Sequence, residues 1–174
     1  GALRELSSQE LSLSMAEASS SSNVRIINSG VSGDTSAGGR ARLDWALAEN
    51  PDAVILELGA NDGLRGLDPR KTEANLGAMI REIGKRKIPI LLTGMRAPPN
   101  LGPEYEAEFN GLYRRLARRH KILLYPFFLA AKTKSSVDLR RPFNSIVNES
   151  ISSSRSIKTN EFLFSKIVLL QKNI

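Results

Sequence analysis

Two short stretches of the chain combine glycine with polar side chains that could contact a ligand. Residues 30–39 contain Gly33, and residues 57–66 contain Asn61, whose side-chain amide stands between Gly59 and Gly63. Glycine and asparagine are also common in turns for backbone reasons alone. A polar turn without chemistry is therefore the alternative interpretation.

The second stretch is expected to follow a buried strand. Residues 53–58 form a short, nearly continuous apolar run after Pro51, which is typical of a strand buried on both faces of a parallel sheet. Gly59 then ends the run. Because open α/β sheets bind their ligands at the carboxyl ends of the strands, we expect the Asn61 side chain at the ligand-binding edge.

The first stretch joins a predicted strand to a predicted helix. Residues 24–28 are rich in β-branched side chains, which favours a strand, and the apolar residues of 43–47 share one helical face. This order also occurs in phosphate-binding loops. However, Gly39 and Arg40 stand where such a loop carries its Lys and its Ser or Thr. We therefore predict no nucleotide and no other cofactor.

The middle of the chain continues the same alternation. We predict helices over residues 69–86 and 103–119, each with an apolar stripe at helical spacing, and further strands over 88–92 and 122–125. Four strands alternating with three helices indicate an α/β fold with a parallel sheet.

The two ends of the chain differ in character from its middle. Residues 1–22 are rich in serine, and residues 132–158 combine Ser, Lys, Arg and Asn with weak periodicity. An apolar patch within 162–169 favours a terminal helix. We predict one α/β domain over residues 1–131 and a divergent, poorly ordered tail over 132–174.

Composition excludes several kinds of functional site. The chain has no cysteine and a single histidine, His120, so thiolate metal sites and a cysteine nucleophile are excluded, and we predict no metal site. No apolar run approaches the roughly 18 residues of a membrane span. The start of the chain has no signal-peptide pattern, and the compartment stays open.

The net charge of +7 permits binding to an anionic partner. The basic residues gather at residues 85–87 and 114–121, where two predicted helices end and cations complement the helix dipole. Solvated helix ends are the favoured interpretation, because no nucleic-acid-binding motif accompanies the charge. A basic nucleic-acid-binding protein is kept as an alternative.

Two sequence blocks carry a resemblance to a known family. Residues 30–39, Gly-Val-Ser-Gly-Asp-Thr-Ser-Ala-Gly-Gly, and residues 57–66, Glu-Leu-Gly-Ala-Asn-Asp-Gly-Leu-Arg-Gly, together resemble the second and third blocks of the SGNH (GDSL-type) hydrolases. The likeness is closest to the bacterial arylesterase, lysophospholipase and acyl-thioesterase branch, and it covers residues 24–129. It implies a flavodoxin-like, three-layer αβα fold and small acyl ester, aryl ester, lysophospholipid or thioester substrates. Members of this family are often periplasmic or secreted.

The resemblance also implies roles for individual residues. Gly33 would donate its backbone N–H, and Asn61 its side-chain amide, to the oxyanion of the reaction. We expect Asp34 and Asp62, which adjoin them in the sequence, to organise the loops rather than to transfer protons.

Other residues of the family's site are missing. The family carries its nucleophile in a Gly-Asp-Ser block on its first strand, but no such block precedes Val24, and no Asp-x-x-His follows His120. His120 itself is expected at the amino edge of the sheet, about 17 Å from the carboxyl edge, whereas a general base must come within about 3 Å of its proton.

We therefore expect this chain, as written, to lack activity, and the missing blocks suggest a truncated or frame-altered coding sequence. A non-catalytic module that binds an acyl group or another anion is the alternative. In the flavodoxin-like strand order 2-1-3-4-5, the missing first strand is central. We expect a gap between the strands at residues 24–28 and 53–58, filled by residues 1–22 or by another chain.

Overall fold

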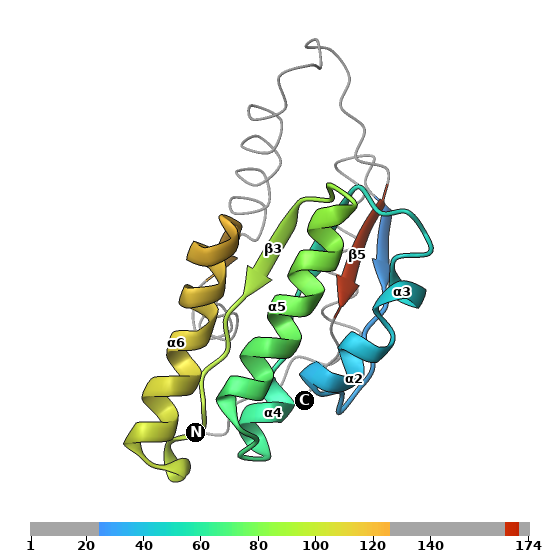
Figure 1. Cartoon of the computed structure of the whole chain (residues 1–174). Helices are drawn as coiled ribbons and strands as arrows, with labels where there is room; N and C mark the ends of the chain where they lie inside the picture. Colours follow the sequence, from blue (N-terminus) through green and yellow to red (C-terminus); the bar gives the residue numbers. More distant parts are fainter. Residues whose placement is uncertain (1–24, 126–165, 171–174) are drawn as a thin grey trace, which may run out of the picture.

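The computed structural model describes residues 25–125 and 166–170, which form a five-stranded parallel sheet covered by helices (Figure 1). In spatial order the strands are β1, β5, β2, β3 and β4. Their bounds are Arg25–Asn28 for β1, Ala53–Leu56 for β2, Ile90–Thr93 for β3, Leu123–Tyr125 for β4 and Lys166–Leu170 for β5. The predicted α/β class with a parallel sheet is confirmed.

Helices α5 and α6 begin at the predicted residues 69 and 103, whereas α2 and α4 begin within stretches expected as loops. Their bounds are Ser36–Ala41 for α2, Leu43–Ala46 for α3, Ala60–Leu64 for α4, Pro69–Lys85 for α5 and Pro103–His120 for α6, with a 3-10 turn η1 at Pro99–Leu101. Thr35 caps α2 by accepting a hydrogen bond from the N–H of Gly38. Asp68 caps α5 in the same way, and Pro69 occupies its first turn, which suits proline because it has no N–H to leave unpaired.

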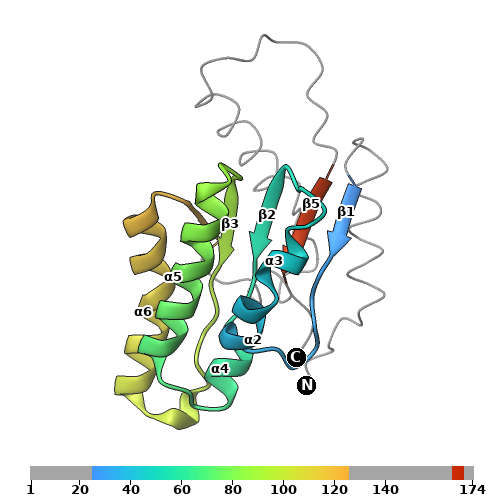
Figure 2. The same ribbon diagram turned by 45° about the vertical axis from the view of Figure 1, so that its right-hand side comes forward.

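One face of the sheet carries the described core. Along β2 the side chains of Val54 and Leu56 are buried, whereas those of Ala53 and Ile55 are half-buried, because successive strand residues point to opposite faces. Figures 1 and 2 show α5 and α6 lying side by side over the sheet. Their buried stripes complete the core: Leu76, Met79, Ile80 and Ile83 on α5, and Phe109, Leu112 and Leu116 on α6.

The central position of the sheet is occupied by β5, so the expected gap does not exist. Ile167 pairs with Ile26 of β1 on one side and with Ala53 of β2 on the other. The terminal helix expected from residues 162–169 is wrong for residues 166–169, which belong to β5. A run of Ile, Val and Leu this short fits a strand as well as a helix, and here two open strand edges supply hydrogen-bond partners on both sides.

The remaining predictions for the ends of the chain lie outside the described residues. These are the organisation of residues 1–22, the character of 132–158 and the place where the domain ends. Strand β5 belongs to the sheet although it lies beyond residue 131.

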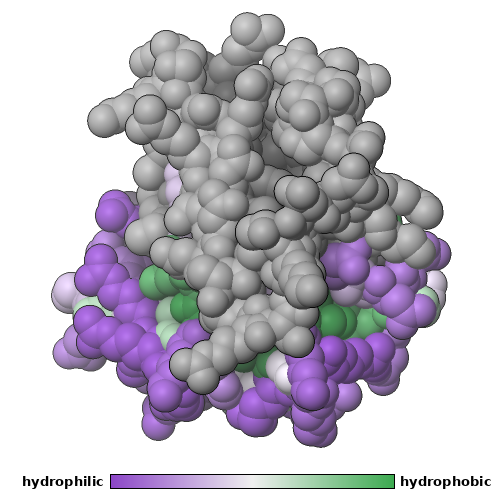
Figure 3. All heavy atoms as spheres, turned by 90° about the horizontal axis from the view of Figure 1, so that it is seen from above, coloured by the Kyte–Doolittle hydropathy of each residue, from purple (hydrophilic) through white to green (hydrophobic). Residues whose placement is uncertain are grey.

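Among the described helices, none is both long and apolar enough to cross a bilayer. Among the coloured atoms in Figure 3 most are hydrophilic, with hydrophobic ones toward the middle of the view.

Candidate active site

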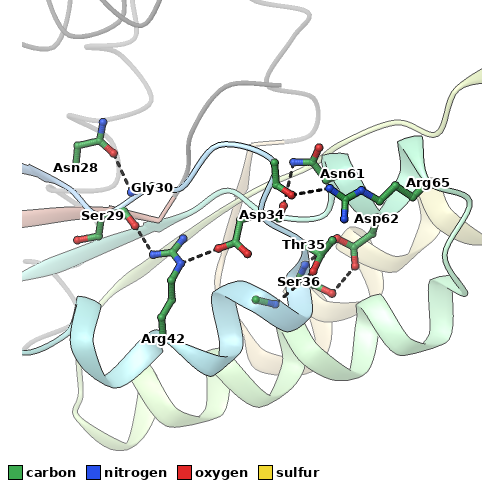
Figure 4. Close-up of polar contacts among 12 residues, drawn as sticks. Asn28, Ser29, Gly30, Asp34, Thr35, Ser36, Arg42, Asn61, Asp62 and Arg65 are labelled. Carbon is green, nitrogen blue, oxygen red and sulfur yellow. Dashed lines mark hydrogen bonds and ion pairs between the residues drawn. The ribbon is translucent and has the colours of Figure 1, made fainter.

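The two motif stretches meet at the carboxyl ends of β1 and β2 (Figure 4). Gly33 lies in the loop after β1, and Asn61 lies in α4, just after β2. The Nδ2 atom of Asn61 donates a hydrogen bond to the backbone oxygen of Asp34 over 2.9 Å. A carboxamide nitrogen carries two hydrogens, and this contact uses one of them. The two loops are therefore in contact, and the roles expected for Gly33 and Asn61 toward a ligand stay predictions.

The turn that presents Asn61 depends on Gly59 and on α6. Gly59 adopts φ +108°, a left-handed conformation that glycine accepts readily, and the chain passes from β2 directly into α4. The Tyr113 hydroxyl of α6 donates to the backbone oxygen of Leu58 over 3.0 Å. Burial raises the pKa of Tyr113 well above its usual range, and the nearby Asp62 and Glu57 carboxylates raise it further. Tyr113 therefore stays protonated and keeps this hydrogen bond.

Two arginines hold the turn at Gly33 and Asp34. Arg42 Nε donates to Asp34 Oδ2 over 2.7 Å, and Arg42 Nη1 donates to the backbone oxygen of Ser29. Arg65 Nη2 donates to the backbone oxygen of Gly33 over 3.0 Å. Gly33 has φ +73°, and its own N–H has no acceptor among the described residues. The turn is thus fixed through its carbonyl and carboxylate oxygens.

Asp62 holds α4 against the neighbouring helices α2 and α5. Its carboxylate is buried and accepts hydrogen bonds from the Ser36 N–H at 2.7 Å, from the Ser36 hydroxyl, and from the Thr72 hydroxyl at 3.0 Å. Asn75 Nδ2 donates to the Ser36 hydroxyl oxygen over 3.1 Å. Asp62 therefore connects α4 to α2 and α5, and the loop-organising roles expected for Asp34 and Asp62 agree with this geometry.

His120 is the last residue of α6, and β4 begins at Leu123. It therefore lies at the amino edge of the sheet, as expected, and not beside Asn61. Its Nε2 atom is buried and has no hydrogen-bond partner among the described residues. Burial lowers the pKa of His120, and the charges of Arg81 and Arg119 lower it further. The geometry gives His120 no contact with the candidate site.

The lowered pKa of His120 predicts a pH-dependent stability. In the unfolded chain the histidine titrates near about 6.5, so as the pH falls below that value the unfolded state binds the proton first. The free energy of unfolding should therefore decrease through this window, until the folded-state pKa is passed. Urea unfolding of the chain and of His120→Gln at a series of pH values measures the effect. Equal pH slopes for the two proteins would contradict it.

Several contacts that shape the site were not predicted from the sequence. Arg65 lies inside the third block, but nothing local indicates that its guanidinium reaches Gly33. Arg42 stands eight positions after Asp34 in the sequence, and this spacing indicates an ion pair only weakly. Tyr113 is predicted only as part of a helix, since its contact with Leu58 spans 55 residues of sequence.

The fold and site define an open-sheet α/β protein with a polar site at the carboxyl edge of its strands. A sequence model of the family described as "GDSL-like Lipase/Acylhydrolase family" matches residues 10–145. The chain belongs to this family, which confirms the predicted SGNH (GDSL-type) resemblance.

Individual relatives agree with this assignment. The chain is 45% identical to "Esterase TesA" of Pseudomonas aeruginosa over 108 residues, which are 62% of this chain and 54% of that protein. It is 38% identical to "Thioesterase 1/protease 1/lysophospholipase L1" of Escherichia coli K12 over 109 residues, 62% of this chain and 52% of that protein. The chain thus spans about half the length of these curated relatives. The crystal structure of AlinE4, an SGNH-hydrolase family esterase, superposes with a TM-score of 0.67 at 39% identity, covering 87% of this chain and 89% of that one.

Proposed function

We propose that the site binds the acyl group of a small ester or thioester, with its carbonyl oxygen between the Gly33 N–H and the free amide hydrogen of Asn61. The observation that carries the proposal is the 2.9 Å hydrogen bond from Asn61 to Asp34, which holds the carboxamide beside the Gly33 turn. Membership of the GDSL-like family supports the same chemistry. The relatives named above as an esterase and as a thioesterase and lysophospholipase indicate the substrate class.

The donors suit a reaction in which negative charge develops on the acyl oxygen. Donors that are fixed before the reaction stabilise this charge without reorganising, and removal of one such donor typically costs about 2.7–4 kcal/mol. Here Arg42 and Arg65 hold the Gly33 turn, and Asp34 holds the Asn61 amide. The site is therefore preorganised by residues that need not touch the substrate.

Turnover needs a nucleophile and a base in addition to these donors. Ser36, although close in sequence to Gly33, is buried and has its hydroxyl bonded to Asp62 and Asn75, and His120 lies at the opposite edge of the sheet. In such machinery, loss of the nucleophile or base lowers turnover by about a millionfold. We therefore propose that the residues of this chain bind and polarise an acyl carbonyl but do not turn it over at a rate typical of an enzyme.

A turnover assay with a parallel binding experiment tests both parts of the proposal. With p-nitrophenyl acetate and an acyl thioester we expect rates near the uncatalysed background, and no labelling by a fluorophosphonate serine probe. Turnover accompanied by serine labelling would overturn the claim of inactivity.

Octanoate, whose carboxylate resembles the acyl oxygen, should bind about tenfold more weakly to Asn61→Ala, as expected for one hydrogen bond to a charged group. The matched control Asn100→Ala, at an exposed residue, should bind as the original chain does; equal affinity in Asn61→Ala would overturn the oxyanion role.

The basic residues near the end of α6 give less support to nucleic-acid binding as a second function. Arg115 pairs with Glu73 at 2.6 Å, and Arg119 approaches the same carboxylate at 3.4 Å. Arg86, at the end of α5, pairs with Asp44 at 2.6 Å. Part of the positive charge is thus balanced within the fold. Nucleic-acid binding stays an alternative prediction from composition, and we do not propose it.

A further inference from the structure

Arg65 is an exposed arginine whose guanidinium lies against the Gly33 turn. It follows α4 directly, as its C-cap, and stands one helical turn after Asn61, so both side chains lie on the same face of the helix. Asn61 donates to the backbone oxygen of Asp34, and Arg65 donates to the backbone oxygen of Gly33. Figure 4 shows both side chains reaching this loop. The positive charge of Arg65 is therefore held beside the two donors of the proposed site.

The guanidinium also lies close to the Cα atom of Gly33. A Cβ atom added to Gly33 would be 3.8 Å from Arg65 Nη2, which is an ordinary van der Waals distance. The guanidinium is charged at every accessible pH. A ligand that accepts a hydrogen bond from the Gly33 N–H would therefore come close to a permanent positive charge.

The charge of Arg65 has no carboxylate partner within the described part of the chain. Arg42, the other arginine at this turn, pairs with Asp34 at 2.7 Å. The carboxylate of Asp62 is buried and is bonded to donors of α2 and α5. A guanidinium has five N–H groups, and the contact with Gly33 uses one of them. Arg65 thus combines an exposed charge with several unused donors at the border of the site.

We propose that Arg65 determines specificity at this site by favouring substrates whose leaving group carries a negative charge close to the ester or thioester bond. The inference rests on the proposed function, because a carbonyl oxygen between Gly33 and Asn61 brings the neighbouring atoms of the substrate toward Arg65. The charge belongs to the leaving group, since Arg65 is exposed whereas an apolar acyl chain gains most by leaving water. A carboxylate or phosphate a few bonds beyond the ester has the geometry that a guanidinium binds best.

Two ligands that differ in the charge of one terminal group test the inference. N-octanoylglycine places a carboxylate beside a stable acyl carbonyl, and N-octanoylglycinamide is its neutral counterpart. Isothermal titration calorimetry at low salt measures both affinities for the full chain. We expect the anion to bind about fivefold more tightly than the amide, which corresponds to a well-formed ion pair at an exposed position. Added salt should reduce this preference.

Arg65→Gln removes the charge but retains an N–H donor, so it should bind the two ligands with equal affinity. The ratio of the two affinities is the informative quantity, because a distorted Gly33 turn would weaken both ligands alike. The matched control is Arg70→Gln. Arg70 is also an exposed arginine, but its charge is paired with Asp68 at 3.5 Å, and its replacement should leave the preference for the anion unchanged.

Failure of this inference and failure of the proposed function give different results. Asn61→Ala should weaken both ligands by the same factor and leave their ratio unchanged. Equal affinities in the original chain, or a preference that survives Arg65→Gln, would overturn the role of Arg65 while the proposed function stands. Absence of binding by either ligand, or affinities that Asn61→Ala does not alter, would overturn the proposed function and this inference with it.

Discussion

Replacement of Gly59 by alanine is expected to destabilise the fold by about 2–5 kcal/mol. Two causes act together at this position. Gly59 has φ +108°, which L residues with a side chain adopt only at a cost. An added Cβ would also lie 2.2 Å from the Tyr113 hydroxyl oxygen, and this hydroxyl is buried and bonded to Leu58. Urea unfolding followed by circular dichroism measures the loss.

Two further variants separate these causes. Gly84→Ala changes a glycine in α5 whose added Cβ would meet nothing within 4 Å, and it should stabilise the chain by up to about 1 kcal/mol. In a Tyr113→Phe background the added Cβ no longer meets a hydroxyl, so Gly59→Ala should cost less there than in the original chain. If Gly59→Ala and Gly84→Ala changed the stability alike, the described turn would be wrong.

Replacement of Asp62 by alanine is expected to destabilise the chain by about 3–5 kcal/mol. The substitution removes the acceptor of three hydrogen bonds, from the Ser36 N–H, the Ser36 hydroxyl and the Thr72 hydroxyl. These donors are buried and would have no water to replace the carboxylate. Because Asp62 adjoins Asn61, we also expect octanoate binding to weaken.

The matched control is Asp68→Ala. Asp68 also accepts a backbone hydrogen bond, from Arg70 over 2.9 Å, but this bond is exposed. The loss of a helix cap at such a position typically costs about 1 kcal/mol. Chemical denaturation of both variants gives the comparison, and an Asp62→Ala chain as stable as Asp68→Ala would show that the Asp62 contacts do not hold the three helices together.

The parts of the site that could be predicted from the sequence depend on local signals. Residues 53–58 read as a buried strand because an apolar run ends at glycine, and the carboxyl-edge rule then places Asn61 near the loop that follows β1. The 2.9 Å contact between Asn61 and Asp34 agrees with this placement. Spacing alone could not predict that the acceptor is a backbone oxygen, because the contact depends on how the two loops approach each other.

The parts that could not be predicted depend on partners that are distant in the sequence. Residues 166–170 are too few for their periodicity to separate strand from helix, and their strand conformation is determined by β1 and β2, which lie more than a hundred residues earlier. The same reason applies to Tyr113, whose hydroxyl meets Leu58 across the interface of α6 with the sheet. In both cases the local sequence is compatible with the observed structure without requiring it.

The central claim is that the Gly33 N–H and the Asn61 carboxamide serve the same acyl oxygen. The most direct measurement is an NMR titration of the nitrogen-15-labelled chain with octanoate, following the backbone amide of Gly33 and the side-chain amides of Asn61 and Asn100. We predict that the Gly33 and Asn61 signals shift together with one dissociation constant, while Asn100 stays unchanged. Shifts of Gly33 and Asn61 with different dissociation constants, or a response from only one of them, would contradict the account.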